Sequence, residues 1–413
     1  MGLKYREPSV CQWLKGHVPR EAVRPVILEA LARRLHRPVT HAEAGFPPPS
    51  QRSNTCPSMV DGLVDLGRHD MDPSRRGIVG AGLFSVALTV PNWPDVLGRM
   101  EAVQSGRALR MGSAEVDMVV AMTERLSELD DQFGGRHARP MAAAFLVNTV
   151  APYLRAEAPE SVRKAMLSAT ADLCYLTGYM AVDEGHHGLA QQYYLKALQL
   201  AGAAEDHLTY CTTLRGMSVQ AVDLGHGRTA LRLGDAAAAA APQAGPRMRA
   251  FLAGQQAHAA ASTGDRGRAL THLRDAETAM EKAESRSKPF GSYDPSALNY
   301  HLGQVCYELG DIAGSVSALE RSDQLRYDVF RRTRVRYRAM LAERQLEIGH
   351  LEAACHTWNL ALDDYPLVQS GRTDQRMAAM CRRIRPHLRQ HAARDLYERA
   401  RTVVPARLLA RQP

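Results

Sequence analysis

The segment DEGHHG (residues 183–188) contains residue types that bind metal ions. Two carboxylates lie beside two histidines, and both side chains are common ligands of zinc. Neither an HExxH motif nor a CxxC pair accompanies them, and these spacings are what place ligands around one ion. A turn between two helices explains Gly185 and Gly188 without a metal. We therefore expect no metal site in this chain.

Other patterns that could support catalysis are also weak. The seven cysteines lie far apart, which argues against a disulfide framework or a zinc site and fits reduced thiols in the cytoplasm. The glycine cluster GIVGAG (77–82) does not follow a strand-like segment, so it does not predict a phosphate-binding loop. We find no P-loop and no GxSxG motif. We expect neither an enzyme nor a cofactor.

The strongest pattern is an internal repeat. Five glycines recur at spacings of 40, 39, 46 and 39 residues, namely Gly185, Gly225, Gly264, Gly310 and Gly349. Small residues lie seven positions before each glycine, namely Gly178, Ser218, Ala257, Gly303 and Ala342. Small residues also lie five positions after each, namely Ala190, Ala230, Ala269, Ser315 and Ala354. A repeated period of this length indicates a stack of helical units.

The order of residues within each unit is that of a tetratricopeptide repeat. Small residues allow two antiparallel helices to approach closely, and the glycine ends the first helix in a left-handed conformation. We therefore predict an all-α fold, a superhelix of tetratricopeptide-type repeats over residues 110–372. The helix expected at about 160–184 belongs to its start. Residues 373–413 are expected to form the C-terminal capping helices that such arrays need.

The first helices of such repeats line the inner wall of the superhelix, which is the usual binding surface. Tyrosines on this wall offer stacking area with a polar tip, which suits recognition of a peptide or protein partner. Counting from the repeat glycines, the inward residues are Asp172, Tyr175, Tyr179, Arg215, His258, Tyr300, Gln304, Tyr307 and Glu343. The alternative is that these tyrosines only pack against neighbouring helices.

The first 46 residues predict a separate small helical head. Ser9 begins a short helix that ends at Gly16, and an amphipathic helix follows over about 21–36. A short helix with polar side chains at its start, supported by a longer helix, suits the DNA major groove. The alternative is an amphipathic helix whose charges are only solvated.

The segments SVCQWLKGHVPR (9–20) and ILEALARRLHRPVTHAEAG (27–45) resemble the recognition and closing helices of Cro/repressor-type helix-turn-helix domains. Together with DPSRRGIVGAGLFSVAL (72–88), GGRHARP (134–140) and the repeats, the chain resembles regulators of high-GC Gram-positive bacteria. These join such a head to tetratricopeptide repeats, and some negatively regulate differentiation and antibiotic production. Such heads normally have two helices before the recognition helix, so we expect this one to be partial.

The resemblance also implies roles for residues of the head. It places Ser9, Val10 and Gln12 toward base edges and Lys15, His17 and Arg20 toward phosphates. The net charge of +8 permits a nucleic-acid partner but is spread along the chain. Because helix-turn-helix proteins commonly bind paired half-sites, we expect a homodimer.

Residues 47–109 are expected to form a linker with an apolar segment. This region begins Pro-rich and polar and continues into SRRGIVGAGLFSVALTV (74–90). Two arginines before an apolar run also resemble an export signal, but the run is distant from Met1 and short for a membrane helix. We expect an apolar linker helix and no membrane association.

The sequence thus favours a cytoplasmic transcriptional regulator of development or secondary metabolism, whose repeat groove binds a peptide or protein and modulates DNA binding. The alternative is a tetratricopeptide interaction scaffold that does not bind DNA and sequesters a partner protein.

Overall fold

The computed structural model describes residues 12–13, 17–19, 23–35, 39, 42–47, 58–72, 111–284 and 293–409. Every regular element in these ranges is a helix, and none of the described residues belongs to a strand. The described residues form two compact units, called here the head (up to Pro47) and the array (from Ser58 onward). The prediction of an all-α fold is confirmed.

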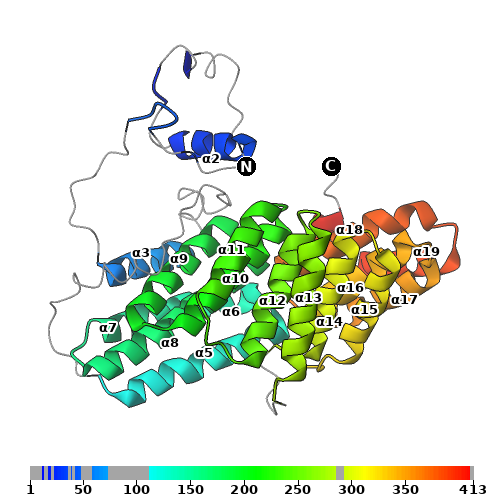
Figure 1. Cartoon of the computed structure of the whole chain (residues 1–413). Helices are drawn as coiled ribbons and strands as arrows, with labels where there is room; N and C mark the ends of the chain where they lie inside the picture. Colours follow the sequence, from blue (N-terminus) through cyan, green and yellow to red (C-terminus); the bar gives the residue numbers. More distant parts are fainter. Residues whose placement is uncertain are drawn as a thin grey trace. The chain divides into compact units, whose positions relative to one another are not determined.

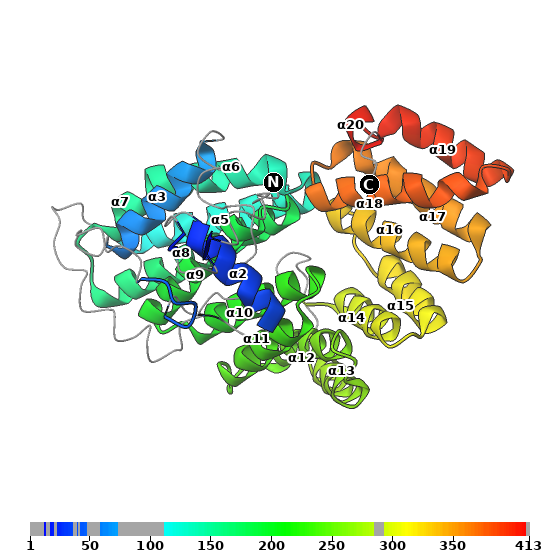
Figure 2. The same cartoon turned by 90° about the horizontal axis from the view of Figure 1, so that it is seen from above.

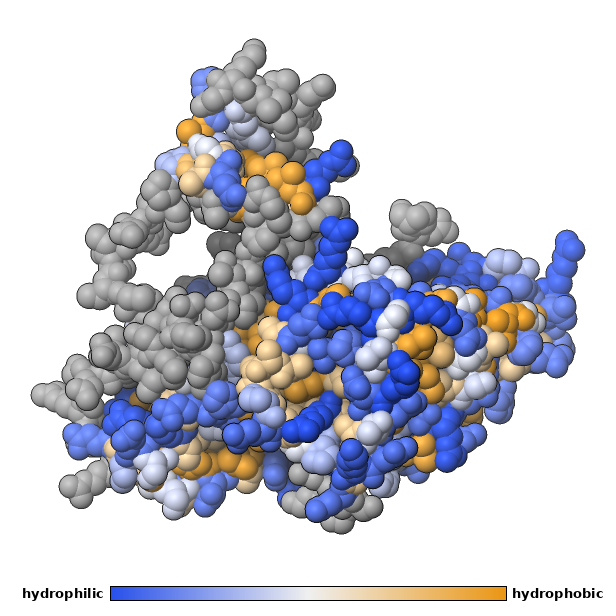
Figure 3. Space-filling model, in the orientation of Figure 1, coloured by the Kyte–Doolittle hydropathy of each residue, from blue (hydrophilic) through white to orange (hydrophobic). Residues whose placement is uncertain are grey.

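The described part of the head is organised around α2 (Arg24–Leu35), the helix expected at about 21–36. Its buried side chains include Leu28 and Ala32, which pack with Val39 into a small core. Leu31 and Leu35 are 37% and 52% exposed, so part of the apolar face expected on this helix is open. Figure 3 shows hydrophobic side chains on the surface of α2.

The array is a succession of helices, most of them packed in antiparallel pairs (Figure 1). It begins with α3 (Met59–Met71), α5 (Ser113–Phe133), α6 (Gly135–Phe145), the π-helical turn η3 (Leu146–Val150) and α7 (Ala151–Leu154). The five repeat pairs are α8 (Glu160–Asp183) with α9 (His187–Ala204), α10 (His207–Asp223) with α11 (Gly227–Ala239), α12 (Pro246–Ala261) with α13 (Arg266–Glu281), α14 (Pro295–Glu308) with α15 (Ile312–Gln324), and α16 (Arg331–Glu347) with α17 (Leu351–Asp364). Then follow η4 (Tyr365–Leu367), α18 (Gly371–Ile384), η5 (Arg385–His387), α19 (His391–Val403) and α20 (Ala406–Leu409).

The repeat glycines adopt the left-handed conformation that the sequence pattern predicts. All five have positive φ, between +77° at Gly225 and +86° at Gly310. Each lies just after the first helix of its pair, so the chain reverses there without the steric cost that a Cβ atom would add.

The small residues of the first helices are needed for close helix packing. A Cβ atom on Gly178 would lie 2.9 Å from the ring of Tyr194 on the paired helix α9. The same atom on Gly303 would lie 3.0 Å from Leu319 on α15. Each large residue therefore fills the space that its glycine leaves, which is the packing expected from the sequence.

The array closes on itself, because α16 and α18 contact the helices at its beginning (Figure 2). The guanidinium of Arg332 on α16 lies 2.9 Å from both Asp130 and Asp131 at the end of α5. The amide of Gln369 donates to the carbonyl of Phe133 at 2.6 Å. Residues some 200 positions apart in the sequence are thereby joined by buried polar contacts.

The expectation of a linker over residues 47–109 is wrong for residues 59–71, which form α3. Val60, Leu63, Val64 and Leu66 recur at helical spacing, and their burial attaches α3 to α6 and α9. Asp70 on this helix is buried, forms an ion pair with Arg139 and accepts a hydrogen bond from Tyr193 at 2.9 Å. The apolar segment 74–90 lies outside the described residues.

Within the ranges that the structure describes, the helices are too short or too polar to span a lipid bilayer.

Candidate functional site: two cavities on the inner wall of the array

One cavity of the array, called here the aromatic cavity, has a volume of about 720 Å³. Its wall is built by the first helices of the repeat pairs, α8, α10, α12, α14 and α16, together with α5. Cavities of roughly 300–1,000 Å³ accommodate small molecules or short peptide segments. Its size and position therefore suit a ligand site.

Aromatic rings form a nearly continuous wall of this cavity. The ring of Tyr293 lies 5.4 Å from both Phe251 and His301. The ring of Tyr300 lies 5.6 Å from His301 and stacks on Tyr337 at 4.0 Å, with an angle of 4° between the planes. Such a wall offers stacking and apolar contact to a bound group.

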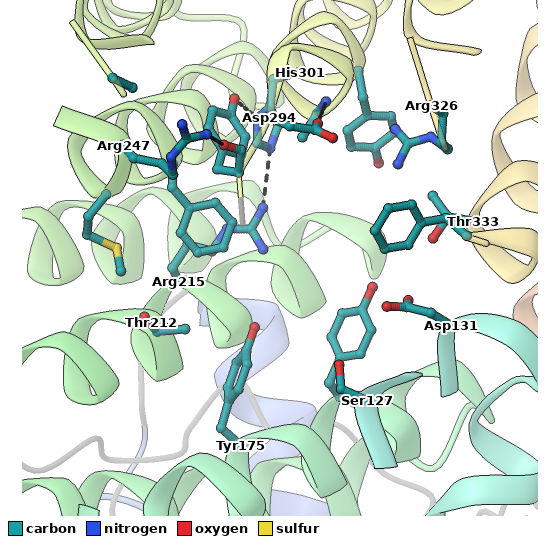
Figure 4. Close-up of a pocket in the computed structure, with 18 of the residues that line it drawn as sticks. Ser127, Asp131, Tyr175, Thr212, Arg215, Arg247, Asp294, His301, Arg326 and Thr333 are labelled. Atoms are coloured by element: carbon teal, nitrogen blue, oxygen red, sulfur yellow. Dashed lines mark hydrogen bonds between the residues drawn. The ribbon is translucent and has the colours of Figure 1, made fainter. Parts of the chain in front are cut away.

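Arg215 on α10 carries a charge into this aromatic surrounding (Figure 4). Its guanidinium lies 4.0 Å above the ring of Phe251, and its Nη2 lies 3.4 Å from Nε2 of His301. Burial lowers the pKa of His301 well below its usual value, so this imidazole is neutral. Among the described residues no carboxylate forms an ion pair with Arg215, and its Nε is buried without a hydrogen-bond partner.

Two further arginines of the cavity bind neutral groups. Arg247 donates to the carbonyl of Tyr293 at 2.6 Å and also to the carbonyl of Glu284. Arg326 lies over the ring of Tyr337 at 4.7 Å. Neither has a carboxylate within ion-pair distance in the described part of the chain.

The carboxylates of the cavity are engaged elsewhere or lie at its edge. Asp130 and Asp131 contact Arg332, and Asp294 accepts the amide of Ala297 at 2.7 Å as the N-cap of α14. Burial raises the pKa of Asp130 to about 8, although Arg332 acts in the opposite direction. Glu284 is exposed. The arginines around the aromatic wall thus remain available to an anionic group.

A second, smaller cavity of about 230 Å³, called here the polar cavity, is lined by residues nearer the C-terminal ends of α10, α12, α14 and α16 and by residues of α18. Arg376 pairs with Glu343 at 2.6 Å, and Arg383 pairs with Glu347 at 2.9 Å. Its lining consists of Val222, Asp223, His258, Gln304, Tyr307, Glu308, Met340, Glu343, Arg344, Glu347, Arg376 and Arg383. Because most of its charged side chains are paired with each other, the polar cavity offers a charged ligand fewer free partners than the aromatic cavity does.

The inward residues expected from the sequence divide between these two cavities. Tyr175, Tyr179, Arg215 and Tyr300 line the aromatic cavity. The members that line the polar cavity are His258, Gln304, Tyr307 and Glu343. Asp172 lines neither of these two cavities; it is exposed and accepts a hydrogen bond from Thr209 at 2.8 Å.

Sequence reasoning missed several residues of the aromatic cavity. Phe251 lies thirteen positions before its repeat glycine, as Asp172 does, Arg247 lies one turn before Phe251, and His301 directly follows Tyr300. Tyr293 precedes α14 in the repeat with the longest spacing, where the register gives no position for it. Applying the register of Asp172 to the third repeat would have found Phe251.

Of the head residues expected to contact DNA, Gln12 and His17 are described, and both are exposed. Gln12 is helical, and its carbonyl accepts the amide of His17 at 3.1 Å. Ser9, Val10, Lys15 and Arg20 lie outside the described residues.

The segment DEGHHG has a structural role in the closure of the array. Asp183 accepts a hydrogen bond from Ser370 at 2.8 Å, and Glu184 pairs with Arg139 at 2.6 Å. Burial lowers the pKa of His187 to about 4. Within the described ranges no group of three or more histidines, cysteines and carboxylates is arranged to hold a metal ion.

Comparison with known proteins bears on the head alone. A family model described as the SP15 N-terminal domain matches residues 1–47. No curated protein and no solved structure matches the chain. The match ends one residue beyond the boundary expected for the head and includes none of the cavity residues.

Proposed function

We propose that this protein is a transcriptional regulator whose helical-repeat array binds a peptide or protein segment and thereby modulates DNA binding by the head. The aromatic cavity carries the proposal. It combines a volume of about 720 Å³ with an aromatic wall and arginines that lack carboxylate partners in the described chain. A cavity with an apolar wall and a few convergent polar groups is the usual form of a ligand site.

The proposed DNA-binding role rests on the head. Its motifs in residues 9–45 resemble helix-turn-helix domains, and exposed Gln12 and His17 are available to a partner. The proposed repeats are of the tetratricopeptide type, and the proposed assembly is a cytoplasmic homodimer that reads paired half-sites. Development and secondary metabolism are the proposed processes, because the resemblance points to them.

A second candidate is an interaction scaffold that sequesters a partner protein without binding DNA. One observation favours it: the described part of the head has a core of Leu28, Ala32 and Val39 with only two partly buried apolar neighbours. Small cores have little stability to spare.

The deciding experiment is recovery of sheared genomic DNA on the purified chain, followed by sequencing. A regulator should enrich discrete sites, and its affinity should fall by roughly 10³-fold or more between low and moderate salt if it contacts several phosphates. Replacement of Gln12 and Lys15 by alanine should abolish the enrichment. Gln324→Ala, an exposed glutamine at the end of α15, is the matched control and should leave it intact.

If no site is enriched while the array is folded, the transcriptional-regulator proposal is rejected and the interaction-scaffold candidate is left. Unchanged site selection in the Gln12 and Lys15 variant would refute the position of the recognition helix.

A further inference from the structure

Arg215 is a cation among neutral groups inside the aromatic cavity. The face of Phe251 lies beneath its guanidinium, neutral His301 lies at one edge, and the hydroxyl of Tyr175 lies beside it. Burial raises the pKa of Tyr175 to about 12, so this hydroxyl also stays neutral. A partly buried charge usually has an ionic partner, because loss of hydration is otherwise uncompensated.

The surroundings hold Arg215 in a defined position. A guanidinium can only donate hydrogen bonds, so Nε2 of His301 accepts from it and the imidazole proton is on Nδ1. That nitrogen lies 2.6 Å from the hydroxyl of Tyr293 and donates to it. A Cβ atom on Gly254 would lie 2.5 Å from both groups, so this glycine makes room for the pair. Two hydrogen bonds in series, from Arg215 to His301 and from His301 to Tyr293, thus orient Arg215 toward the cavity (Figure 4).

We infer that Arg215 binds the carboxylate of a ligand whose apolar or aromatic body lies along the wall of Phe251, Tyr293 and Tyr300. A carboxylate accepts two parallel hydrogen bonds from a guanidinium, which gives it an advantage over a neutral amide of the same shape. This inference rests on the ligand-binding role proposed above and specifies the chemical class of the ligand. Two sources share that chemistry, the C-terminal carboxylate of a peptide and a small organic acid.

Other charges of the cavity agree with this assignment. Arg247 and Arg326 form no ion pair with a carboxylate in the described chain, although Arg326 acts electrostatically on Asp131, and Arg332 pairs with both Asp130 and Asp131 on the opposite side. Arg247 also donates to the carbonyl of Tyr293 and thereby fixes the wall next to Arg215. An anionic ligand therefore enters a cavity in which unpaired cations predominate.

The test uses four probes in two matched pairs, with the full-length chain. One pair is 4-phenylbutyrate and 4-phenylbutanamide, and the other is the acetylated tetrapeptide Ala-Leu-Ala-Phe as free acid and as amide. Calorimetric titration gives the Kd of each probe. In the wild-type chain at least one acid should bind about tenfold more tightly than its amide, as expected for a charge-assisted pair of hydrogen bonds.

Arg215→Gln should reduce the ratio of amide Kd to acid Kd to about one. Because both probes are measured on the same protein, this ratio does not depend on the fraction that is folded. Tyr293→Phe, which removes the hydroxyl that orients His301, should reduce the ratio in part. The matched control is Arg232→Gln, an exposed arginine on α11 of the same repeat, and it should keep the wild-type ratio.

The outcomes separate this inference from the proposed function. Equal binding of acid and amide peptides would overturn the carboxylate assignment and leave peptide binding intact. A preference for phenylbutyrate that needs Arg215, with no binding of either peptide, would support the assignment and reject the peptide. An acid preference that survives in Arg215→Gln, or binding of none of the four probes, would overturn the inference.

Discussion

At the residue scale, the inner wall of the array is characterised by ionisable groups that burial has made neutral or that lack partners. Two histidines illustrate this. His301 accepts from Arg215, and His258 lines the polar cavity with its Nε2 buried and without a hydrogen-bond partner. Burial lowers the pKa of both. A neutral imidazole remains polar without compensating a neighbouring cation, which is why Arg215 beside His301 is open to an anionic ligand.

The buried state of His258 predicts a pH dependence of stability. Burial lowers its pKa to about 4, with Arg344, Arg336 and Arg215 adding to the effect and Asp223 opposing it. Between this value and about 6.5, its pKa in unfolded chains, the unfolded state binds a proton and the native state does not. The free energy of unfolding should therefore fall as the pH decreases through this window.

Urea denaturation at pH 7, 6 and 5 measures this dependence. His258→Gln should lose less stability over the acidic range, by up to about 1.4 kcal/mol per pH unit. His356→Gln, an exposed histidine on α17, should retain the wild-type profile. Parallel profiles for wild type and His258→Gln would show that His258 is hydrated or charged in the native state.

At the element scale, the array depends on a turn that only glycine adopts readily. Gly225 has φ +77°, and a Cβ atom there would meet nothing within 4 Å. Its requirement for glycine is therefore conformational and does not come from crowding. Gly178 is the opposite case, since it lies within a helix and is required because Tyr194 occupies the space beside it.

Gly225→Ala and Gly267→Ala form a matched pair that tests this distinction. Gly225→Ala should lower the free energy of unfolding by about 1 kcal/mol, because alanine is strained at positive φ. Gly267 is exposed in the first turn of α13, and alanine there should stabilise by about 0.5–1 kcal/mol through helix propensity. Chemical denaturation measures the change in the free energy of unfolding for both variants. A neutral or stabilising Gly225→Ala would contradict the left-handed turn.

At the scale of the whole molecule, the array is held together by a buried ionic cluster between its two ends. Arg332 contacts Asp130, Asp131 and Asp183, and Ser370 donates to Asp183 at 2.8 Å. Burial alone would lower the pKa of Arg332, but the surrounding carboxylates raise it well above its usual value. The aromatic cavity includes Arg332 and both aspartates of α5, so the closure also completes its wall.

Arg332→Met should leave buried carboxylates without their cation. Loss of one partner of a buried ion pair costs about 3–5 kcal/mol, which urea denaturation would detect. Hydrogen exchange at the amide of Gln369, which donates to Phe133, should become faster because the two ends separate more readily. Arg321→Met, on the exposed face of α15, should change stability by less than about 0.5 kcal/mol. Unchanged exchange at Gln369 would show that the ends are held by other contacts.

The sequence alone determined the repeat architecture of this protein. A glycine at the same position of all five repeats specifies the left-handed turns, and small residues at fixed distances from it specify the close helix pairs. Both are local steric requirements that the residue types themselves satisfy. The same register identified Tyr175, Tyr179, Arg215 and Tyr300 as residues of the inner wall. It did not identify α3 as part of the array, because the Pro-rich segment before it indicated a linker.

The tertiary structure decided which of these residues share a cavity and which of them are paired. Arg332 meets Asp130 only because the superhelix closes, and that closure depends on the summed rotation of all the repeats. Arg215 and Arg332 are the same residue type on first helices, but one faces aromatic rings and the other three carboxylates. Local sequence patterns encode the helix pair, whereas the charge balance of the cavity arises from contacts between residues far apart in the chain.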